Sequence, residues 1–529
     1  MALTLGACGR GRGTAPAPPR PVPIPHRKRG EAMSERWLPY DAGPEGNSPK
    51  GTAMMKTPLL RILLMLSFLG LLGGCIGASP DRPATSAPRA RPSPTQLPTA
   101  TPAPTAAPEL IRLLGLGDRL RLSADGRWGV GMDRESLFLW DAGRGVFEPL
   151  RVGPEGQPAA GLGPALSADG RLLAFFARSP LPASAADPDC YPLAVYDRLT
   201  GGLEWLPGGV SRMGLAGHAG PALSADGRWI AWANDSACNP GPGVYLYDRY
   251  SQRLHRVHPP TESPAASGGA LVALSADGRF LAFVTKDDGV VPEDRNGQFD
   301  VFLYDRETGK TVWVSRPVRP EDPPQPSGLQ LVPGTDGAWE GGIALSADGR
   351  FLAFAAAARL VDRPLKPCAP WPWAEPLPFC RHIYLYDRET GQMALVDANA
   401  AGEPGDGAAE GPAISGDGRW VVFATRARNL GSVGAMECPA RPVWGRPCDL
   451  WLAVWDRATG RVTILSRGEA GRLAGPSYNP VLSADGRWLA WVSEALEWVA
   501  TPPPLPQGRP ADFLYLAERE ALLRLSGGP

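Results

Sequence analysis

Residues 274–280 read Leu-Ser-Ala-Asp-Gly-Arg-Phe, and this stretch decides the fold because close copies of it occur seven times along the chain. Each copy runs into a short apolar segment, such as Phe280-Leu-Ala-Phe-Val284. We number the copies repeat 1 to repeat 7 by the aspartates of their Asp-Gly pairs, Asp125, Asp169, Asp226, Asp277, Asp348, Asp417 and Asp485. Repetition of this kind predicts identical supersecondary units that pack against one another.

A second motif follows each copy, and in repeat 4 it reads Val301-Phe-Leu-Tyr-Asp305. In the other repeats up to the sixth it ends on Asp141, Asp197, Asp248, Asp387 and Asp456. The seventh motif, Asp512-Phe-Leu-Tyr-Leu516, places Leu516 where the others have the aspartate. A Thr-Gly pair and a further β-rich segment follow several copies, as in Thr311-Val-Trp-Val-Ser315.

The two motifs predict four strands in each repeat. Asp-Gly provides the positive φ that a tight hairpin needs between the first two strands, and Thr-Gly does the same between the last two. Aromatic and β-branched residues fill the strands themselves. A single sheet of this size cannot bury both of its faces. We therefore predict an all-β fold, a β-propeller of four-stranded antiparallel blades, with seven blades favoured over six or eight.

Composition agrees with a turn-rich β fold. The 529 residues include 64 Gly and 60 Pro, yet 43% are hydrophobic and 17 are Trp, so a large core can form between frequent turns. Lys and Arg together number 54, and so do Asp and Glu. This zero net charge argues against nucleic acid as a partner, because phosphate binding needs a basic surplus. We expect a monomer.

The first hundred residues predict a targeting segment and a tether rather than a folded domain. Residues 54–74 combine a short basic region with the apolar run 62–72 and then two glycines before Cys75. They resemble a bacterial lipoprotein signal peptide with the lipobox Leu72-Gly-Gly-Cys75, which implies lipid attachment (palmitate among the acyl chains) at Cys75 and an extracytoplasmic place in the cell envelope. Residues 1–53 then lie upstream of the true start or are disordered. Residues 75–109 form a Pro/Ser/Thr/Ala-rich tether, and residues 110–529 form the propeller.

The two motifs resemble the WD40-like propeller repeats of the TolB family, which carry Ser-Pro-Asp-Gly where this chain has Ser-Ala-Asp-Gly. The resemblance covers the whole predicted propeller and implies that fold. TolB propellers have six blades and bind a peptidoglycan-associated lipoprotein, whereas this chain has seven motif copies and a lipobox of its own. The resemblance therefore implies the fold and the compartment more strongly than the partner.

Loop lengths predict which face of the propeller binds. From the Asp-Gly aspartate to the end of the second motif there are 16 residues in repeat 1, from Asp125 to Asp141, and 39 in repeat 5, from Asp348 to Asp387. The return to the next Asp-Gly takes 28 to 30 residues in every case except the 43 between Asp305 and Asp348. The variable loops between second and third strands emerge on one face, which we call the long-loop face. Variable loops on a rigid scaffold are where binding usually occurs.

Repetition also separates structural acids from candidate functional ones. The Asp-Gly aspartates recur in every repeat, which indicates a role in the turn. In repeat 4, Asp294, Asn296 and Asp300 surround Gly297 and form a candidate Ca²⁺ site, with an ordinary polar turn as the alternative. We expect no other cofactor.

Repeat 5 carries a proline-rich insertion with three aromatic residues. Trp371, Trp373 and Phe379 could form a platform for a sugar or a protein, or they could cover the propeller's own core.

Six cysteines lie in the loops of the long-loop face. Cys368 with Cys380 and Cys438 with Cys448 are local pairs, and Cys190 with Cys238 then pair by elimination. An even number of cysteines indicates disulfides in an oxidising compartment, which fits the lipoprotein signal.

No motif of a hydrolase, metalloprotease or nucleotide-binding protein is present. We therefore expect a non-enzymatic, membrane-anchored propeller that binds an envelope protein or polysaccharide through the long-loop face. The alternative is a carbohydrate-active enzyme, a glycosidase or a lyase, with acids at the mouth of the central channel. Glu410, just before the motif of repeat 6, is a candidate acid for it.

Overall fold

The computed structural model describes residues 111–117, 119–133, 136–152, 156–179, 189–211, 220–234, 238–257, 269–319, 342–367, 379–431, 450–465, 474–500 and 512–527. The chain divides into two compact units, Met1–Thr99 and Ala100–Pro529, and all of the described residues belong to the second. Cys75 and the signal and tether segments lie outside the described residues, so the predictions made for them stay predictions.

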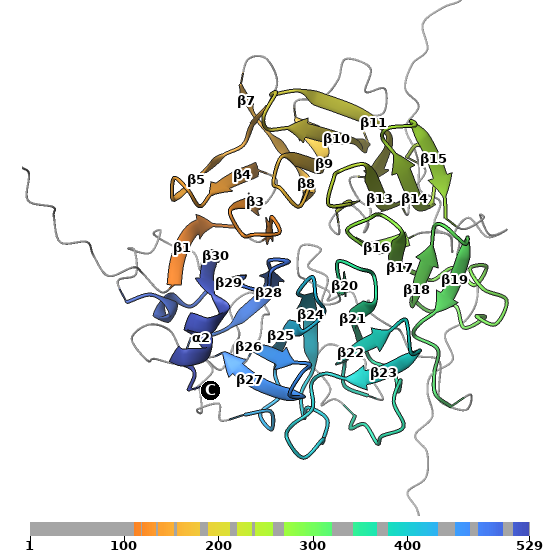
Figure 1. The fold of residues 1–529 in the computed structure, drawn as a ribbon, viewed down its shortest axis with the longest axis vertical. Coiled ribbons are helices and arrows are strands. Elements are labelled where there is room, and N and C mark those ends of the chain that lie inside the picture. Colours follow the sequence, from red (N-terminus) through yellow and green to blue (C-terminus); the bar gives the residue numbers. More distant parts are fainter. Residues whose placement is uncertain are drawn as a thin grey trace, which may run out of the picture. The chain divides into compact units, whose positions relative to one another are not determined.

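Each of repeats 1 to 6 forms four antiparallel strands that are paired in chain order (Figure 1). Repeat 1 forms β2 (Arg119–Leu122), β3 (Trp128–Asp133), β4 (Ser136–Asp141) and β5 (Val146–Pro149), and repeat 2 forms β8 (Ala160–Leu166), β9 (Leu172–Ser179), β10 (Cys190–Asp197) and β11 (Leu203–Ser211). Repeat 3 forms β12 (Ala222–Leu223), β13 (Trp229–Asn234), β14 (Gly243–Asp248) and β15 (Arg253–Arg256), and repeat 4 forms β16 (Gly269–Leu274), β17 (Phe280–Thr285), β18 (Asp300–Asp305) and β19 (Lys310–Trp313). Repeat 5 forms β20 (Ile343–Leu345), β21 (Phe351–Ala356), β22 (His382–Asp387) and β23 (Gln392–Leu395), and repeat 6 forms β24 (Ala409–Ile414), β25 (Trp420–Thr425), β26 (Trp451–Asp456) and β27 (Arg461–Leu465). This architecture confirms the predicted all-β propeller of four-stranded antiparallel sheets.

Two smaller features lie between these strands. A single bridge between Ser136 and Ala160 joins the sheets of repeats 1 and 2. The loop between them forms the short hairpin of β6 (Arg151–Val152) and β7 (Gln157–Pro158).

Repeat 7 closes the propeller with a strand from the other end of the domain. It contributes β28 (Ser477–Leu482), β29 (Trp488–Ser493) and β30 (Phe513–Glu518), and a 3-10 helix, η2 (Leu496–Trp498), lies in its long loop. Its fourth strand is β1 (Ile111–Leu116), which pairs with β30 in the register Ile111 opposite Ala517. Where the other repeats continue into a fourth strand, α2 (Arg519–Leu525) follows β30. In Figure 1 the orange strand β1 lies beside the dark-blue strand β30.

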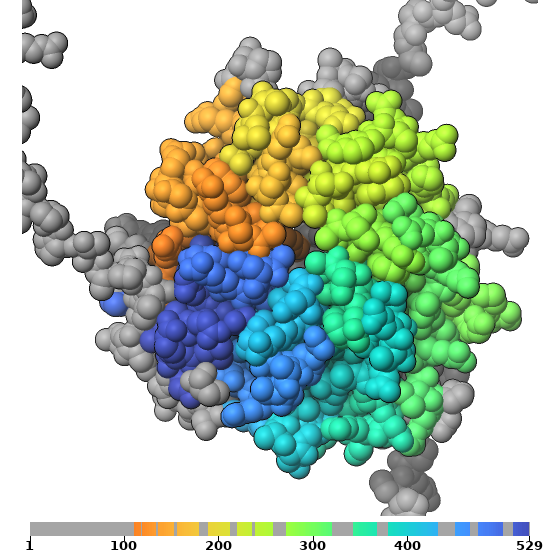
Figure 2. Space-filling model, in the orientation of Figure 1, coloured from red at the N-terminus to blue at the C-terminus, as the bar shows by residue number. Residues whose placement is uncertain are grey.

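A ring of backbone hydrogen bonds runs through all seven repeats at the Asp-Gly turns. In repeats 1 to 6 the N–H of the residue after the motif serine donates to the carbonyl of its counterpart in the next repeat, at 2.7–3.1 Å, along the series Ala124, Ala168, Ala225, Ala276, Ala347, Gly416 and Ala484. The N–H of Asp485 donates back to the carbonyl of Ala124 at 3.0 Å and closes the ring. In Figure 2 the repeats follow one another around the centre until orange meets blue.

The turn glycines bring neighbouring repeats into close contact. Gly278 has a φ of +68°, and a Cβ added there would lie 2.4 Å from Cδ1 of Trp229, which begins strand β13 of the preceding repeat. The guanidinium of Arg306 also packs over the Trp229 ring, 4.2 Å from its centre. Gly126 of repeat 1 makes the same contact with Trp488 of repeat 7, so this packing also closes on itself.

The second strands form the middle of the core. β13, β17 and β21 are buried at every residue, because each sheet packs between two others and both faces of these strands are covered. Aromatic rings of the second and third strands stack within a sheet, as Phe283 does on Phe302 with ring centres 5.4 Å apart. Among the described residues, no helix has the length and apolar character needed to cross a membrane.

The turn contact predicts a specific loss of stability. Gly278→Ala requires a left-handed φ of an alanine and places its methyl group against Trp229, so we expect a loss of about 3 kcal/mol or more in the free energy of unfolding. Gly309→Ala is the matched control, because Gly309 has a φ of +67° and nothing within 4 Å of an added Cβ. It should lose only about 1 to 2 kcal/mol. Urea unfolding of both variants measures the difference, and equal losses would show that the contact with Trp229 contributes nothing.

Candidate functional site

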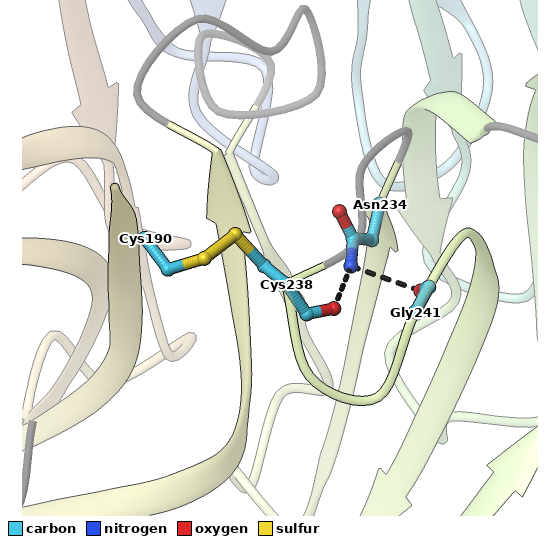
Figure 3. Close-up of a disulfide and its surroundings, with 4 residues drawn as sticks. All are labelled: Cys190, Asn234, Cys238 and Gly241. Carbon is cyan, nitrogen blue, oxygen red and sulfur yellow. Dashed lines mark hydrogen bonds between the residues drawn. A yellow bond between two sulfur atoms is a disulfide. The ribbon is translucent and has the colours of Figure 1, made fainter. Parts of the chain in front are cut away.

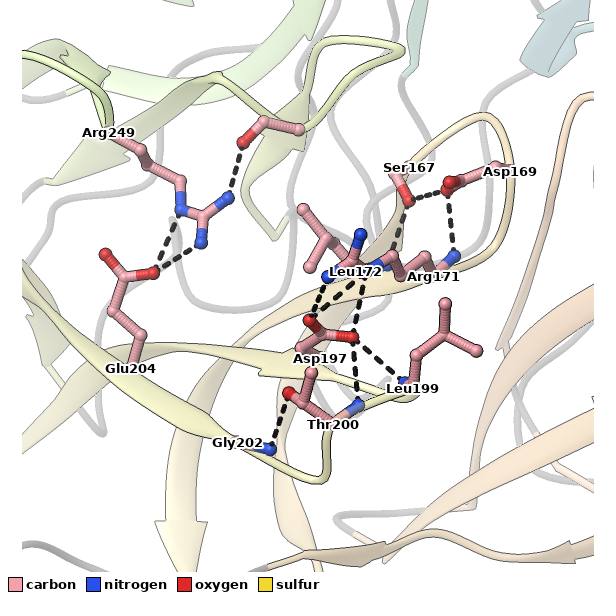
Figure 4. A network of polar contacts seen from close by, with 11 residues as sticks. Ser167, Asp169, Arg171, Leu172, Asp197, Leu199, Thr200, Gly202, Glu204 and Arg249 are labelled. Atoms are coloured by element: carbon pink, nitrogen blue, oxygen red, sulfur yellow. Dashed lines mark hydrogen bonds and ion pairs between the residues drawn. The ribbon is translucent and has the colours of Figure 1, made fainter. Parts of the chain in front are cut away.

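The Asp-Gly aspartates are used entirely by their own turns. In repeat 2, Ser167 Oγ donates to Asp169 Oδ1 at 2.6 Å, and the same oxygen accepts from the N–H of Arg171 at 2.9 Å (Figure 4). The N–H of Leu172 donates to Ser167 Oγ and completes the turn. The serine-aspartate bond occurs in all seven repeats, at 2.5–2.7 Å. The interpretation of these aspartates as structural is confirmed.

The second motif is tied to the same turn by an ion pair. Arg171 binds Asp197 through Nε and Nη2, at 3.0 and 2.6 Å, and these bonds hold the pKa of the Asp197 carboxyl well below its usual range. The same pair recurs as Arg228–Asp248, Arg279–Asp305, Arg350–Asp387 and Arg419–Asp456. These ion pairs connect the two hairpins of one sheet and engage the aspartates of the second motif.

Repeat 7 corrects one prediction from the sequence. The aspartate position of its second motif is held by Glu518, because β29 and β30 pair with Trp488 opposite Glu518, as Trp420 pairs with Asp456 in repeat 6. Glu518 accepts from Arg487 at 2.6 Å, and Leu516 is a core residue. Strand register, which the motif pattern does not contain, decides the equivalence.

The contact between repeats 2 and 3 differs from the others, because repeat 2 has a leucine where the second strand of the other repeats begins with an aromatic residue. Arg249 donates to the carbonyl of Gly227 at 2.9 Å, as its counterparts do in other repeats. The preceding repeat has Leu172 at the position of the aromatic ring, and Arg249 binds Glu204 of that repeat through Nε at 3.1 Å (Figure 4). An ion pair thus replaces a cation–π contact between neighbouring sheets.

The long-loop face differs from repeat to repeat, beginning with a disulfide between repeats 2 and 3 (Figure 3). Cys190 at the start of β10 is bonded to Cys238, with their Cα atoms 5.8 Å apart. The buried amide of Asn234 donates to the carbonyls of Cys238 and Gly241, at 2.7 and 2.9 Å, and fixes the loop that carries Cys238. The predicted pairing of Cys190 with Cys238 is confirmed.

The acidic loop of repeat 4 gathers the residues of the candidate calcium site. Asp294 and Asp300 are each about 1% exposed. Asn296 donates its side-chain N–H to Asp300 Oδ2 at 2.8 Å, and its backbone N–H reaches Asp294 Oδ1 at 3.3 Å. Asp300 Oδ1 also accepts from Trp313 Nε1 and Ser315 Oγ, at 2.9 and 2.5 Å. Asp300 is therefore held in the sheet, while Asp294 faces it from the loop.

Burial and neighbouring carboxylates change the ionisation of Asp294. Desolvation raises its pKa to about 7, with a further contribution from the charge of Asp300 and smaller ones from Asp288 and Asp287. A bound cation would oppose this repulsion. Within the described part of the chain, no group of three or more His, Cys, Asp and Glu side chains is arranged to hold a metal ion. The candidate calcium site has two carboxylates and the amide of Asn296, and it stays a prediction.

Repeat 5 has a buried histidine–aspartate pair in the place of the Asp300–Ser315 pair. His382 begins β22 as Asp300 begins β18, and its Nδ1 is 2.8 Å from Asp397 Oδ2. The N–H of Ile383 donates to Asp397 Oδ1, as that of Val301 donates to Ser315 Oγ. Both His382 and Asp397 are fully buried. The sequence reasoning missed this pair, although a His and an Asp at positions that hold Asp and Ser in repeat 4 could have indicated it.

Glu410 lies in the innermost strand of repeat 6 and is paired with an arginine of repeat 5. Its Oε2 is 3.2 Å from Nη2 of Arg381, and both side chains are almost completely buried. The Nε of Arg381 also approaches the carbonyl of Ala409 at 3.3 Å. The contact joins two neighbouring repeats, and it fixes the carboxylate of the candidate acid against a guanidinium.

The remaining candidates are only partly within the described residues. Phe379 is half-buried, and Cys380 is buried and disulfide-bonded. Trp371, Trp373, Cys368, Cys438 and Cys448 lie outside the described residues, so the aromatic platform and the pairings of Cys368 with Cys380 and of Cys438 with Cys448 stay predictions.

The sheets and the closed ring define a β-propeller, and solved structures of this class are similar to the chain. They include TolB from Acinetobacter baumannii, with 16% identity, a TM-score of 0.34, and coverage of 66% of this chain and 62% of that one. An oligogalacturonate lyase from Vibrio parahaemolyticus has 12% identity, a TM-score of 0.41, and coverage of 77% and 91%. A β-propeller domain from Myceliophteria thermophila has 11% identity, the same TM-score, and coverage of 77% and 98%.

The four-stranded sheets and the closed ring of backbone hydrogen bonds make the chain a β-propeller in its fold. The TM-scores lie below 0.5 and the match spans less than two thirds of TolB, so the sheets and the ring, rather than these likenesses, establish the architecture. No family model matches the sequence, and no curated protein matches it.

The environment of Asp294 predicts a pH dependence of stability. Its pKa is about 7 in the folded protein and about 4 in an unfolded chain, so folding favours the protonated acid. This contribution is complete below about pH 4, declines as the pH rises to about 7, and is then lost, for a total of at most about 4 kcal/mol. In Asp294→Asn this decline should be absent. Urea unfolding between these pH values measures it, with Asp362→Asn, a 73% exposed aspartate side chain, as the control that keeps the wild-type slope. An unchanged slope in Asp294→Asn would contradict the prediction.

Calcium gives a second test with the same proteins. At about pH 7.5 and about 1 mM Ca²⁺ we expect a higher melting temperature for the wild type, because the cation offsets repulsion between Asp294 and Asp300. Asp294→Asn should lose the response, and Asp362→Asn should keep it. A wild-type melting temperature that Ca²⁺ leaves unchanged excludes the site.

Proposed function

We propose that the chain is a lipid-anchored, extracytoplasmic β-propeller that acts as a binding scaffold for a protein or polymer of the bacterial cell envelope. Its binding surface would be the long-loop face. The proposal does not require a catalytic step.

The observation that carries this proposal is the unequal distribution of unique residues between the two faces. At the Asp-Gly turns the same serine, aspartate and arginine contacts recur from repeat to repeat and saturate each other. On the long-loop face each repeat differs, with a disulfide in repeats 2 and 3, the acidic loop in repeat 4 and the His382–Asp397 pair in repeat 5. A face that varies on a rigid scaffold is suited to recognition.

Two separate features of the chain support a location outside the cytoplasm. The lipobox at Cys75 and the proline-rich tether predict export and a membrane anchor. The disulfide between Cys190 and Cys238 supports an oxidising environment. Together they support a propeller held outside the cytoplasm on a stalk.

The contacts of Glu410 favour binding over the enzymatic alternative. A glycosidase of the usual kind needs two carboxyl groups across a substrate cleft. Glu410 is instead buried against Arg381, in a contact that joins two sheets. We therefore keep the scaffold as the proposed function.

Cross-linking and affinity capture from detergent-solubilised membranes test the proposal. We expect the wild type to fractionate with membranes and to capture a defined envelope component, and Cys75→Ser to move to the soluble fraction. The triple variant Trp371→Ala, Trp373→Ala, Phe379→Ala keeps the loop length and the cysteines, and it should lose the component.

The matched control removes exposed apolar side chains from the opposite face. Leu199 and Tyr250 are 67% and 71% exposed at the turns after the second motif. The double variant Leu199→Ala, Tyr250→Ala should capture the component as the wild type does. Equal capture by all three proteins would refute the long-loop face as the binding surface, and a soluble wild type would refute the anchor.

A further inference from the structure

One arginine breaks the repeat pattern at the innermost strands. Arg121 is the residue before the motif leucine of repeat 1, two positions from the serine that begins the Asp-Gly turn. The equivalent residues of the other repeats are small, namely Ala165, Ala222, Ala273, Ala344, Ala413 and Val481. These residues lie on the inner strands β8, β12, β16, β20, β24 and β28, which surround the centre of the propeller next to the ring of backbone hydrogen bonds. A long cationic side chain therefore occupies an inner-strand position near the turn that holds a small apolar residue in the other six repeats.

The side chain of Arg121 is accessible to water and yet crowded by protein. The residue is exposed, whereas desolvation by the surrounding atoms and the charge of Arg119 lower its pKa to about 10. Arg119 lies two positions before Arg121 on the same strand, β2, so both side chains project from the same face of the sheet. A second guanidinium is therefore close to that of Arg121.

Arg121 makes no structural contact that explains its presence. Among the described residues its one hydrogen bond goes from Nη1 to the carbonyl of its neighbour Leu120, at 3.3 Å, and no carboxylate pairs with it. The turn arginines differ, since Arg171 and Arg228 each bind an aspartate through two nitrogens. Five repeats show that alanine suits this position in the sheet, so the fold does not require the arginine.

We propose that Arg121, with Arg119 beside it, forms an anion-binding site at the turn end of the propeller axis, which takes a phosphate or carboxylate group of a small ligand. The guanidinium has several N–H donors in a planar fork that matches two oxygens of such a group. Partial desolvation strengthens this attraction, and an anion would relieve the repulsion between the two arginines. The site lies at the opposite end from the long-loop face and goes beyond the proposed function.

Isothermal titration calorimetry of the full chain in detergent tests this site. The probes are inorganic phosphate and acetate, each at constant ionic strength set with NaCl. We expect the wild type to bind at least one of them, with an affinity that falls as salt rises. Binding of phosphate alone assigns a phosphoryl group, and binding of acetate alone assigns a carboxylate.

Two substitutions separate recognition from folding. Arg121→Ala introduces the residue that five other repeats already carry, so its melting temperature without ligand should equal or exceed that of the wild type. Its affinity for the probe should fall by about tenfold or more, because charge-assisted hydrogen bonds are lost. Arg121→Lys keeps the charge without the fork and should lie between the two.

The control is Arg144→Ala in the same repeat, since the Arg144 side chain is 61% exposed and paired with Glu148 at 2.8 Å. It should bind the probe as the wild type does. The proposal is overturned if neither probe binds the wild type, if Arg121→Ala binds as well as the wild type, or if Arg144→Ala loses as much affinity as Arg121→Ala.

Discussion

The close contact between each Asp-Gly turn and the neighbouring repeats is the constraint on which the rest of the structure depends. One turn donates a backbone hydrogen bond to the next, and its glycine lies against the ring that begins the second strand of the preceding repeat. Because any side chain at that glycine would collide with the ring, the spacing of the sheets around the axis is set at this point. In repeats 2, 4, 5, 6 and 7 an arginine near the end of the third strand covers the same ring, as Arg306 covers Trp229, so these repeats hold their predecessors by stacking as well as by hydrogen bonds.

This arrangement divides the residues into those used by the fold and those left for recognition. The serines, aspartates and arginines of the turns satisfy one another, and the pKa of Asp197 shows how firmly its carboxylate is held. Charged residues without a repeated role occur elsewhere. Asp294 is buried beside other carboxylates, and Arg121 stands among alanines at the axis, and both are costly for the folded state. Residues that a fold keeps at such a cost are the reasonable candidates for binding.

The sequence predicted the fold in detail because its signals are local and repeated. Asp-Gly marks a hairpin wherever it occurs, and the copies gave the four strands of repeats 1 to 6 and the structural role of the turn aspartates. The pairing of Cys190 with Cys238 followed from elimination among a few cysteines. The candidate site was predicted less well. Asp294, Asn296 and Asp300 do meet in one loop, but the His382–Asp397 pair and the contact of Arg381 with Glu410 join residues far apart in the chain. No local pattern marks such contacts, because they depend on how strands and sheets are placed.

The sequence by itself thus determined the unit, a four-stranded sheet with its two hairpin turns, since backbone preferences at glycine and the alternation of side chains act over a few residues. The tertiary structure decided how the units close. It placed β1 beside β30, gave Glu518 the aspartate position that the motif pattern assigned to Leu516, and brought Arg381 of repeat 5 against Glu410 of repeat 6. These outcomes depend on strand register and on the fit between first and last repeats. Both are set by packing between distant segments, which a short stretch of sequence does not encode.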